Sequence, residues 1–598
     1  MKVSKWTADF ETTTDENDCR VWAYSICNVN NPEEFIYGNT LDSFFEWCFE
    51  RGTNLKIWFH NLKFDGVYLL SWLDAHSFER IEKPEDKADG TYTTLITDMG
   101  QFYSIKMYFQ DGNKIRYVEF LDSLKIFPNM SVDKIAKGFD LPIQKLSIDY
   151  NKFRPIGYEL EQAEIDYIRN DVEIVARALQ IMFDEGLTKM TIAGDAMQDF
   201  KKRMVGFRKK FPLLTPEVDA DIRSSYRGGF TYCNEEWQGK NVDGGIILDV
   251  NSLYPSTMVQ FPLPYGQPYF FEGKYEDDNV YPLYVQSLSC VFELKEGKIP
   301  CIQMKNHMSF IPNEYVKSSQ GMKVQLWLTK PDYELFLEHY NVYNPVYHGG
   351  WKFKESQGYF DDYINYWTER KIQASKEGNA SIRQISKLML NSLYGRFGLS
   401  PKASQKKPVF DRDGVMHFVN LPTEERESMY IPIASFITAY GRNRTIRTSQ
   451  IIKDYTKQKY GRDLYFYSDT DSIHCYLSDD DLEELKDIIK IDDYALGCWA
   501  KEGEFTRGMY LRQKCYIEEI DGKCHVTVAG LPKYLAPLIS FENFKRGFST
   551  VGMTRDEMIK LAMKNGATNE EIEKLHPKLI YKYVKGGVIL KETDFTIK

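Results

Sequence analysis

The sequence lacks the features that mark secreted, membrane-spanning or zinc-binding proteins. Its ten cysteines include no Cys-x-x-Cys pair, so the spacing typical of metal sites is absent, and buried thiols in a reducing compartment are expected. No run of about 18 apolar residues is present, and Met1–Trp6 contains no apolar stretch of a signal peptide. We therefore expect a soluble cytoplasmic protein that does not contact membranes.

An overall excess of positive charge is also missing. The formal net charge is −10 at pH 7, whereas nucleic-acid-binding proteins are usually basic. Residues 351–450 nevertheless contain 16 Lys or Arg and 10 Asp or Glu, a local balance of +6 that leaves −16 for the rest. This segment fits either a phosphate-binding channel or a solvated helical face. The aromatic content of 15% likewise fits core packing or base stacking.

The chain is long enough for several domains. It has 598 residues, of which 43% are hydrophobic, and domains usually take roughly 100–200 residues each. Over residues 1–190, short β-type runs such as Lys5–Thr12 and Leu55–Phe59 alternate with helical patterns such as Ala163–Phe183, which predicts an α/β region. A second α/β region begins at the predicted strand Gly245–Val250. No internal repeat is visible.

Composition divides the remainder of the chain. Residues 261–358 are rich in proline and aromatic residues and predict an insertion with short strands. Residues 359–394 have helical periodicity interrupted near Glu377–Asn379, which predicts two antiparallel helices. Residues 398–431 predict a protruding hairpin, and a small mixed module is expected from about residue 530.

Acidic residues mark the first α/β region. Asp9 and Glu11 lie two apart in a predicted strand, so their carboxylates share one face. Adjacent acids repel and are most easily held together by a hard cation such as Mg²⁺ or Mn²⁺. Asp65 lies near a strand-to-helix turn, and Tyr167 and Asp171 share a helical face. Four acids and a tyrosine fit two-metal phosphodiester hydrolysis, whereas Asp9 and Glu11 alone would favour an exposed acidic strand end.

Three more acids lie at strand ends in the second α/β region. Asp249 ends the apolar strand within Ile246–Pro255, and Asp469 and Asp471 occupy the turn of a hairpin predicted over Asp463–Leu477. Buried acids at strand ends are costly unless a metal or hydrogen bonds satisfy them. The spacing therefore predicts a second divalent-metal site. Solvated turn acids are the alternative, which the Asp-x-x-Ser-Leu-Tyr-Pro motif beginning at Asp249 disfavours.

The first acidic set resembles that of the DEDDy-type 3′–5′ exonucleases, whose acids come in this order and end in Tyr-x-x-x-Asp. The resemblance covers roughly residues 1–190. It implies a water-positioning role for Tyr167 and metal ligation by four residues: Asp9, Glu11, Asp65 and Asp171.

The second set resembles the palm motifs of family B DNA polymerases, together with a third motif at Lys387–Gly395. The resemblance implies that Asp249 and Asp471 hold two Mg²⁺ or Mn²⁺ ions, with the Val250 carbonyl as a further ligand and Asp469 as a supporting acid. It assigns nucleotide contacts to five residues: Tyr254, Lys371, Arg383, Lys387 and Tyr394. Ordinary amphipathic packing is the alternative for the helix that carries this third motif.

Nearly the whole chain resembles the protein-primed DNA polymerases of small Bacillus phages with linear genomes. The resemblance is carried by these segments, among others: Trp22–Tyr24, His60–Gly66, Asp122–Lys125, Tyr226–Phe230, Asn313–Tyr315, Tyr510–Tyr516 and Thr593–Lys598. It implies template-directed DNA synthesis with strand displacement, 3′–5′ proofreading, and initiation on a terminal protein. The implied partners are primer-template DNA, single-stranded DNA, deoxynucleoside triphosphates and that protein, for a monomer in the cytoplasm of an infected bacterium.

The resemblance also implies an α/β multidomain fold in which an RNase H-like exonuclease precedes a right-hand polymerase. The implied units are an exonuclease domain (1–190), a connector with the start of the palm (191–260), a first terminal-protein-region insertion (261–358), fingers (359–397), a second insertion (398–431), the rest of the palm (432–530) and a thumb (531–598).

DNA contacts follow from the same resemblance. The implied residues are Thr12, His60, Asn61, Phe64, Ser123, Leu124, Lys145, Tyr226, Gly229, Phe230, Ser252, Thr438, Lys514 and Tyr516. The last two are predicted to share one face of a strand over Tyr510–Glu519.

The sequence departs from this family in three places. Ser147 stands where relatives often have an acid shortly after the lysine matching Lys145, residues 553–575 predict an added pair of short helices, and the hairpin near Ile520–Lys523 is trimmed. The two intact acidic sets disfavour two other classes of protein. A nuclease with a degenerate polymerase region would lack the palm acids, and a non-enzymatic terminus-binding protein would need neither acidic set.

Overall fold

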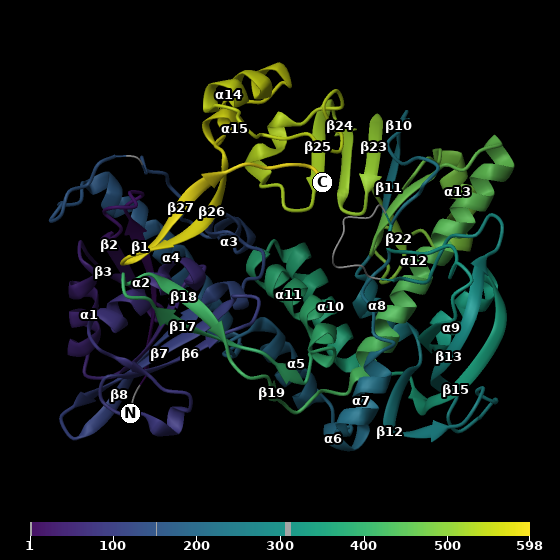
Figure 1. The fold of residues 1–598 in the computed structure, drawn as a ribbon, viewed down its shortest axis with the longest axis horizontal. Helices are drawn as coiled ribbons and strands as arrows, with labels where there is room; N and C mark the ends of the chain where they lie inside the picture. Colours follow the sequence, from purple (N-terminus) through teal and green to yellow (C-terminus); the bar gives the residue numbers. More distant parts are fainter. Residues whose placement is uncertain (1–2, 151, 305–312) are drawn as a thin grey trace.

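The computed structural model describes residues 3–150, 152–304 and 313–598, so part of the predicted insertion 261–358 lies outside the described residues. The chain forms a mixed α/β multidomain molecule (Figure 1). Within the described ranges, no helix is long and apolar enough to cross a membrane.

An eight-stranded sheet organises the amino-terminal region, in the order β3-β2-β1-β4-β8-β7-β6-β5. Its strands are β1 (Val3–Thr12), β2 (Val21–Asn28), β3 (Asn31–Gly38), β4 (Asn54–Phe59), β5 (Glu79–Arg80), β6 (Thr91–Ile96), β7 (Phe102–Asp111) and β8 (Lys114–Asp122). The helices are α1 (Leu41–Glu50), α2 (Leu62–Ala75), α3 (Val132–Gly138) and α4 (Gln162–Asp184), with 3₁₀ turns at Pro84–Asp86 and Ser123–Lys125. The predicted strands at Lys5–Thr12 and Leu55–Phe59 and the predicted helix at Ala163–Phe183 are confirmed.

Helices cover both faces of this sheet because its central strands alternate apolar side chains between the two sides. On β4, Ile57 and Phe59 pack in one cluster with side chains of α1 and α2. The intervening Trp58 packs in the other cluster, which includes Val172 and Val175 of α4. The sheet is therefore a buried central layer, and the ends of its strands are available for a site.

A second, five-stranded sheet has the order β22-β11-β21-β20-β9. Its strands are β9 (Thr231–Cys233), β11 (Gly245–Val250), β20 (Tyr465–Asp469), β21 (Ser472–Cys475) and β22 (Trp499–Phe505). The helices of this part of the chain are α5 (Ile192–Arg203), α6 (Phe207–Lys210), α7 (Pro216–Arg223), α8 (Leu253–Gln260), α12 (Ile431–Tyr460) and α13 (Asp479–Ile489). The predicted strand Gly245–Val250 and the predicted hairpin are confirmed.

The predicted insertion forms a sheet of its own, in the order β12-β15-β13-β14. It comprises β12 (Leu263–Phe271), β13 (Leu283–Leu294), β14 (Val324–Thr329), α9 (Lys330–His339) and β15 (Tyr340–Ser356). The expectation of short strands was wrong, because β15 spans 17 residues and β13 spans 12. Register shifts along this pair break the alternation that would mark a long strand. Gly350 lies so close to β13 that an added Cβ would meet the Val285 carbonyl oxygen at 2.0 Å.

The two predicted antiparallel helices are α10 (Asp361–Glu377) and α11 (Ala380–Phe397). Gly378 ends α10 with a left-handed φ of +69°, and Asn379 caps α11 by accepting a hydrogen bond from the Ile382 amide. The predicted hairpin follows as β17 (Lys406–Phe410) and β18 (Met416–Asn420), flanked by the paired β16 (Lys402–Ala403) and β19 (Glu424–Glu425).

The carboxyl-terminal part contains a four-stranded sheet, β10-β23-β24-β25, and a separate two-stranded hairpin. Its elements are β10 (Asn241–Val242), β23 (Arg507–Arg512), β24 (Cys515–Ile520), β25 (Lys523–Val528), a 3₁₀ turn at Lys533–Leu538, α14 (Arg555–Lys564), α15 (Asn569–Glu573), β26 (Lys578–Val584) and β27 (Gly587–Thr593). The pair of short helices predicted over residues 553–575 is thus confirmed. The β26–β27 hairpin, yellow in Figure 1, lies against α2 of the amino-terminal region.

One predicted strand in this part was wrong. The chain reverses between β23 and β24, so Lys514 lies in a tight turn with a φ of +56° rather than within a strand Tyr510–Glu519. Positive φ at the third position of a turn is usually provided by Gly or Asn. The sequence has neither there, so no typical turn residue marks the reversal.

Candidate active sites

The amino-terminal acids converge from three elements. Asp9 and Glu11 extend from β1, Asp65 lies in the first turn of α2, and Asp171 and Tyr167 lie on α4. The backbone amide of Phe10 donates to Asp65 Oδ1 (3.3 Å), and Thr7 Oγ1 on β1 donates to the Val172 carbonyl oxygen on α4 (2.8 Å). These contacts between elements distant in sequence fix the five side chains at one end of the central strands.

Burial and mutual repulsion control the electrostatics of this cluster. Burial, and then the charge of Asp171, raise the pKa of Asp9 to about 7. Burial raises the pKa of Glu11 well above its usual value, and Asp9 and Asp171 add to the effect. Burial and then Asp9 also raise the pKa of Asp65. The charges of neighbouring acids therefore contribute to each of these raised pKa values, as expected of carboxylates that share one site.

A positive charge already lies beside these acids. Lys145 Nζ lies 2.5 Å from Asp171 Oδ2, whereas the buried Asp171 Oδ1 has no hydrogen-bond partner among the residues that the structure describes. An unpaired carboxylate oxygen among buried acids fits the oxygen ligands that Mg²⁺ and Mn²⁺ prefer. In the described part of the chain, no three His, Cys, Asp or Glu side chains form a ready-made metal-binding group. The oxygen ligands that these acids supply nevertheless fit a hard divalent cation.

Several predicted DNA contacts of the amino-terminal region lie at the start of α2 and just after β8. His60 bonds Ser123 Oγ through Nδ1 (2.8 Å) and the Met130 carbonyl oxygen through Nε2 (2.9 Å). Asn61 precedes α2 with a left-handed φ of +78°. Leu124 lies in the short 3₁₀ turn after β8. Because Ser123 is fully buried, its hydroxyl serves to orient His60.

Tyr150 is a residue of this site that sequence reasoning missed. The hydroxyl of Tyr150 lies 2.9 Å from the hydroxyl of Tyr167. The Tyr167 side chain is only 3% exposed. Tyr150 is in an irregular segment without periodicity, so no sequence signal pointed to it.

The three acids predicted for the palm, Asp249, Asp469 and Asp471, lie together at a hairpin turn. Asp249 on β11 faces Ser472 on β21, and Asp469 closes the turn against the same serine. The backbone amide of Val250 donates to the Asp471 carbonyl oxygen (2.8 Å). Burial, and then the charge of Asp471, raise the pKa of Asp249 to about 7.

The three palm acids have different partners. Burial, and then the charge of Asp469, raise the pKa of Asp471, which forms no salt bridge with any cation in the described part of the chain. Asp469 instead accepts both bonds from Lys514 Nζ, at 2.5 and 2.6 Å, and one from Thr231 Oγ1 (3.1 Å). This supports Asp249 and Asp471 as the pair that shares a cation, with Asp469 as the supporting acid.

A glycine permits the close approach of the loop before β9 to this turn. An added Cβ on Gly229 would meet the Thr470 side chain at 2.6 Å, whereas one on Gly228 would meet no described residue within 4 Å. The Thr470 amide donates to the Phe230 carbonyl oxygen (2.6 Å), and its φ is +62°. The predicted motif Tyr226–Phe230 thus shapes the turn that carries the acids.

The predicted nucleotide contacts also gather in one place. The rings of Tyr254 and Tyr394 have centroids 4.2 Å apart. Burial, and then the charges of Arg383 and Lys387, lower the pKa of Lys371. Three cations from α10 and α11 therefore lie near one another, as a site for a polyanion requires.

The comparisons with known proteins agree with this geometry. Residues 51–155 and 146–487 match the family described as DNA polymerase type B, organellar and viral. The DNA polymerase of Bacillus phage M2 is 41% identical over the full length of both chains. The chain belongs to the type B DNA polymerases. It is therefore a nucleotidyltransferase of the viral DNA-replication type.

Solved structures resemble the whole polymerase as well. Phi29 DNA polymerase complexed with primer-template DNA and incoming nucleotide substrates has a TM-score of 0.87 at 39% identity, covering 100% of both chains. Phi29 DNA polymerase complexed with single-stranded DNA has a TM-score of 0.86 at 38% identity, again over both chains in full. The mixed α/β multidomain fold is thus that of phi29 DNA polymerase.

Some predicted DNA contacts lie inside the polymerase rather than on its surface. Phe230 is fully buried and Thr438 is 1% exposed, and Thr438 Oγ1 donates to the Ala434 carbonyl oxygen within α12. Sequence reasoning missed the neighbouring Arg442. Its guanidinium donates to the carbonyl oxygens of Arg227 (2.7 Å) and Gly228 (2.8 Å). A single buried Arg in an amphipathic helix gives no local signal of such a contact.

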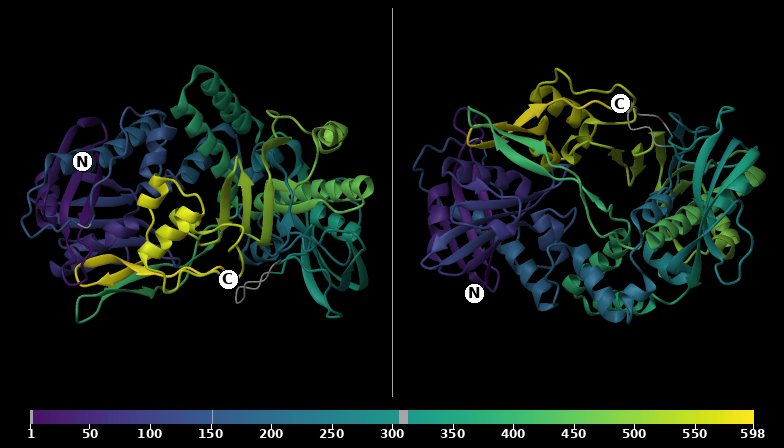
Figure 2. Two further views of the ribbon diagram at one scale, coloured as in Figure 1. Left: turned by 90° about the horizontal axis from the view of Figure 1, so that it is seen from above. Right: turned by 60° about the horizontal axis from the view of Figure 1, so that its bottom comes forward.

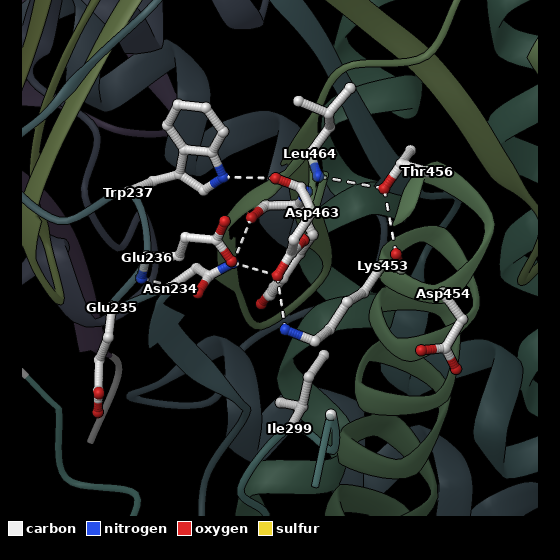
Figure 3. Close-up of polar contacts among 12 residues, drawn as sticks. Asn234, Glu235, Glu236, Trp237, Ile299, Lys453, Asp454, Thr456, Asp463 and Leu464 are labelled. Carbon is white, nitrogen blue, oxygen red and sulfur yellow. Dashed lines mark hydrogen bonds and ion pairs between the residues drawn. The ribbon is translucent and has the colours of Figure 1, made fainter. Parts of the chain in front are cut away.

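A buried network fixes the strand that leads to Asp469 (Figure 3). Asp463, 3% exposed, accepts hydrogen bonds from Lys453 Nζ (2.5 Å) and Asn234 Nδ2 (2.9 Å). Its carbonyl oxygen accepts from Trp237 Nε1 (2.7 Å). A buried acid is stable when it is paired and hydrogen-bonded in this way. The sequence showed Asp463 only as the start of a hairpin.

Proposed function

We propose that this polymerase extends DNA primers at the palm acids, removes 3′-terminal nucleotides at the amino-terminal acids, and starts replication of a linear phage genome on a protein primer. Two separate clusters of acids with raised pKa carry the proposal, represented by Asp249 and Asp9. Acids whose charged forms are disfavoured without a cation are typical of phosphoryl-transfer sites. The ligands of the phi29 structures support DNA and nucleotides as substrates here.

In the palm, Asp249 and Asp471 would hold two divalent cations, with the Val250 carbonyl as a further ligand. Such cations lower the pKa of an attacking hydroxyl and neutralise the leaving oxygen. The primer 3′-hydroxyl would release its proton to solvent water and form a bond to the α-phosphorus of the nucleotide, while the bond from that phosphorus to pyrophosphate would break. Lys514, now bonded to Asp469, would contact the primer strand.

The helices α10 and α11 would bind the incoming nucleotide. Lys371, Arg383 and Lys387 would neutralise its triphosphate. Burial, and then the charges of the other two cations, lower the pKa of Lys371, and this closeness of three cations supports a shared polyanion. Tyr394 would pack on the nascent base pair. Tyr254 would lie beneath the sugar of the nucleotide, where its ring leaves no room for a 2′-hydroxyl. The contact between the rings of Tyr254 and Tyr394 supports this placement.

At the amino-terminal site, four acids would hold the cations for phosphodiester hydrolysis: Asp9, Glu11, Asp65 and Asp171. Tyr167 would orient the attacking water, and Tyr150, bonded to its hydroxyl, would fix that orientation. Lys145 would offset the charge of Asp171. The acids of each site serve one reaction, so the two activities should be separable by mutation.

The two predicted insertions, 261–358 and 398–431, would contact the terminal protein and enclose DNA. One contact supports enclosure: Phe418 on β18 packs against Phe102 of the amino-terminal region (6.0 Å) and Tyr583 on β26 (5.6 Å). Figure 2 shows the two hairpins side by side. A hairpin that joins these two parts would keep DNA from leaving, which favours processivity and strand displacement.

The decisive experiment compares primer extension and 3′ degradation in Mg²⁺ for wild type, Asp249→Ala and Asp9→Ala. We expect Asp249→Ala to abolish extension and keep degradation, and Asp9→Ala to do the reverse. Extension that survives both changes would show that the palm assignment is wrong. For protein priming, the polymerase should attach dAMP covalently to its genome's terminal protein, and the absence of such a product would exclude that part of the proposal.

A further inference from the structure

The carboxyl-terminal hairpin is anchored on the helix that carries Asp65. Val588 is fully buried in the core cluster of the amino-terminal region, and its carbonyl oxygen accepts a hydrogen bond from the Tyr68 hydroxyl (2.5 Å). An added Cβ on Gly587 would meet the Tyr68 ring at 2.2 Å, so the hairpin backbone lies directly on α2. The position of the hairpin relative to the acidic site is therefore well defined.

Tyr581 on this hairpin contacts the start of the same helix. Its hydroxyl accepts a hydrogen bond from Asn61 Nδ2 (3.1 Å). Its ring lies 5.9 Å from that of Phe64, and Lys63 Nζ lies 5.4 Å from its centre. Burial raises the pKa of Tyr581, and the charges of Asp65 and Asp122 add to the effect. The phenol is therefore close to the acidic site.

The orientation of the Asn61 side chain depends on this contact. Asn61 has a left-handed backbone, and its side chain makes no capping bond to α2. Its backbone amide donates to Asp122 Oδ1 (3.1 Å), but within the described residues the side-chain amide bonds only to Tyr581. One N–H is thereby committed, which leaves Oδ1 and the second N–H for a ligand.

We propose that Tyr581 is a positioning residue of the exonuclease site, which holds the Asn61 amide ready for the 3′ end of single-stranded DNA. The inference rests on the proposed exonuclease function. Because the partners are 520 residues apart, degradation depends on the placement of the carboxyl-terminal hairpin. If the hairpin moves away from α2, the Asn61 amide loses its side-chain partner and binds the strand less well.

Tyr581→Phe tests this by removing one oxygen atom while keeping the ring contacts. Tyr583→Phe is the matched control, because Tyr583 is on the same face of β26 and its hydroxyl makes no hydrogen bond among the described residues. On a single-stranded oligonucleotide in Mg²⁺, we expect Tyr581→Phe to raise KM for degradation about three- to tenfold, the effect of one hydrogen bond. Its kcat, its primer extension and its melting temperature should stay at wild-type values, as should all parameters of Tyr583→Phe.

A double-mutant cycle with Asn61→Ala separates positioning from general support of the fold. If Tyr581 acts through Asn61, Tyr581→Phe should have no further effect on KM once the amide is gone. Additive effects, an unchanged KM in Tyr581→Phe, or faster degradation by that variant would each overturn the inference. If the wild-type polymerase itself degrades no DNA, the proposed exonuclease function fails instead, which is a different result.

Discussion

The two acidic sites both consist of clustered carboxylates, but the surroundings of these carboxylates differ. In the amino-terminal site the Asp171 side chain is 5% exposed, and its neighbours come from a strand and two helices that pack around them. In the palm the Asp469 side chain is 18% exposed, and two of the three acids lie on a turn held by hydrogen bonds. Changes of charge should therefore have the largest effect at the amino-terminal site. At the palm site, changes of backbone shape should also lower activity.

The largest effect is expected from neutralising one palm acid. Asp471→Asn should lower primer extension about a thousandfold, because a cation ligand contributes several kcal/mol to transition-state stabilisation. Asp469→Asn is the matched variant, because it makes the same change at the other acid of the turn. We expect its loss of primer extension to be at least tenfold smaller, since Lys514 already neutralises Asp469. Equal losses in a steady-state extension assay would contradict the division of roles between these acids.

A smaller effect should follow from a change of shape without charge. Gly229→Ala adds a methyl group that meets Thr470 at 2.6 Å, and overpacking of this kind usually costs about 1–3 kcal/mol. We expect primer extension to fall about ten- to a hundredfold while degradation of single-stranded DNA is unchanged. Gly228→Ala, which adds the same methyl group in open space, should extend primers normally. If both variants behave alike, the close approach is not what matters.

The smallest effect concerns the stability of the amino-terminal site. The pKa of Asp9 is raised from 3.8 to about 7 in the folded chain, so between these values the folded state binds a proton that the unfolded state does not. This acid therefore makes folding less favourable as pH rises through that range. At pH 8 without divalent cations, we expect Asp9→Asn to stabilise the protein by about 1–3 kcal/mol.

Urea unfolding followed by tryptophan fluorescence measures this gain. It should shrink as pH falls from 8 toward 4, and also when Mg²⁺ is added to the wild type, because a cation favours the charged carboxylates. The exposed Glu50→Gln is a control that should show neither change. A gain for Asp9→Asn that does not vary with pH would show that repulsion among the acids is not its cause.

Local patterns predicted most elements of the fold, because the periodicity of apolar residues indicates a helix or strand and turn residues mark where it ends. The strand with Asp9, the helix with Asp171 and the break at Gly378 were all visible in this way. The Lys514 turn was not, since no turn residue marks it. The long strands β13 and β15 were not either, since irregular register disguised them.

The sequence by itself predicted which residues would carry the chemistry: the acids and the basic side chains of α11 by their type and spacing, and Gly229 by the family resemblance. Only the tertiary structure decided how they are held. It brought Asp65 and Asp171 to the end of β1, placed Lys514 on Asp469, surrounded Asp463 with its partners and set Tyr581 against Asn61. Those contacts join residues that are far apart along the chain, and side-chain pairing across such distances leaves no local pattern to read.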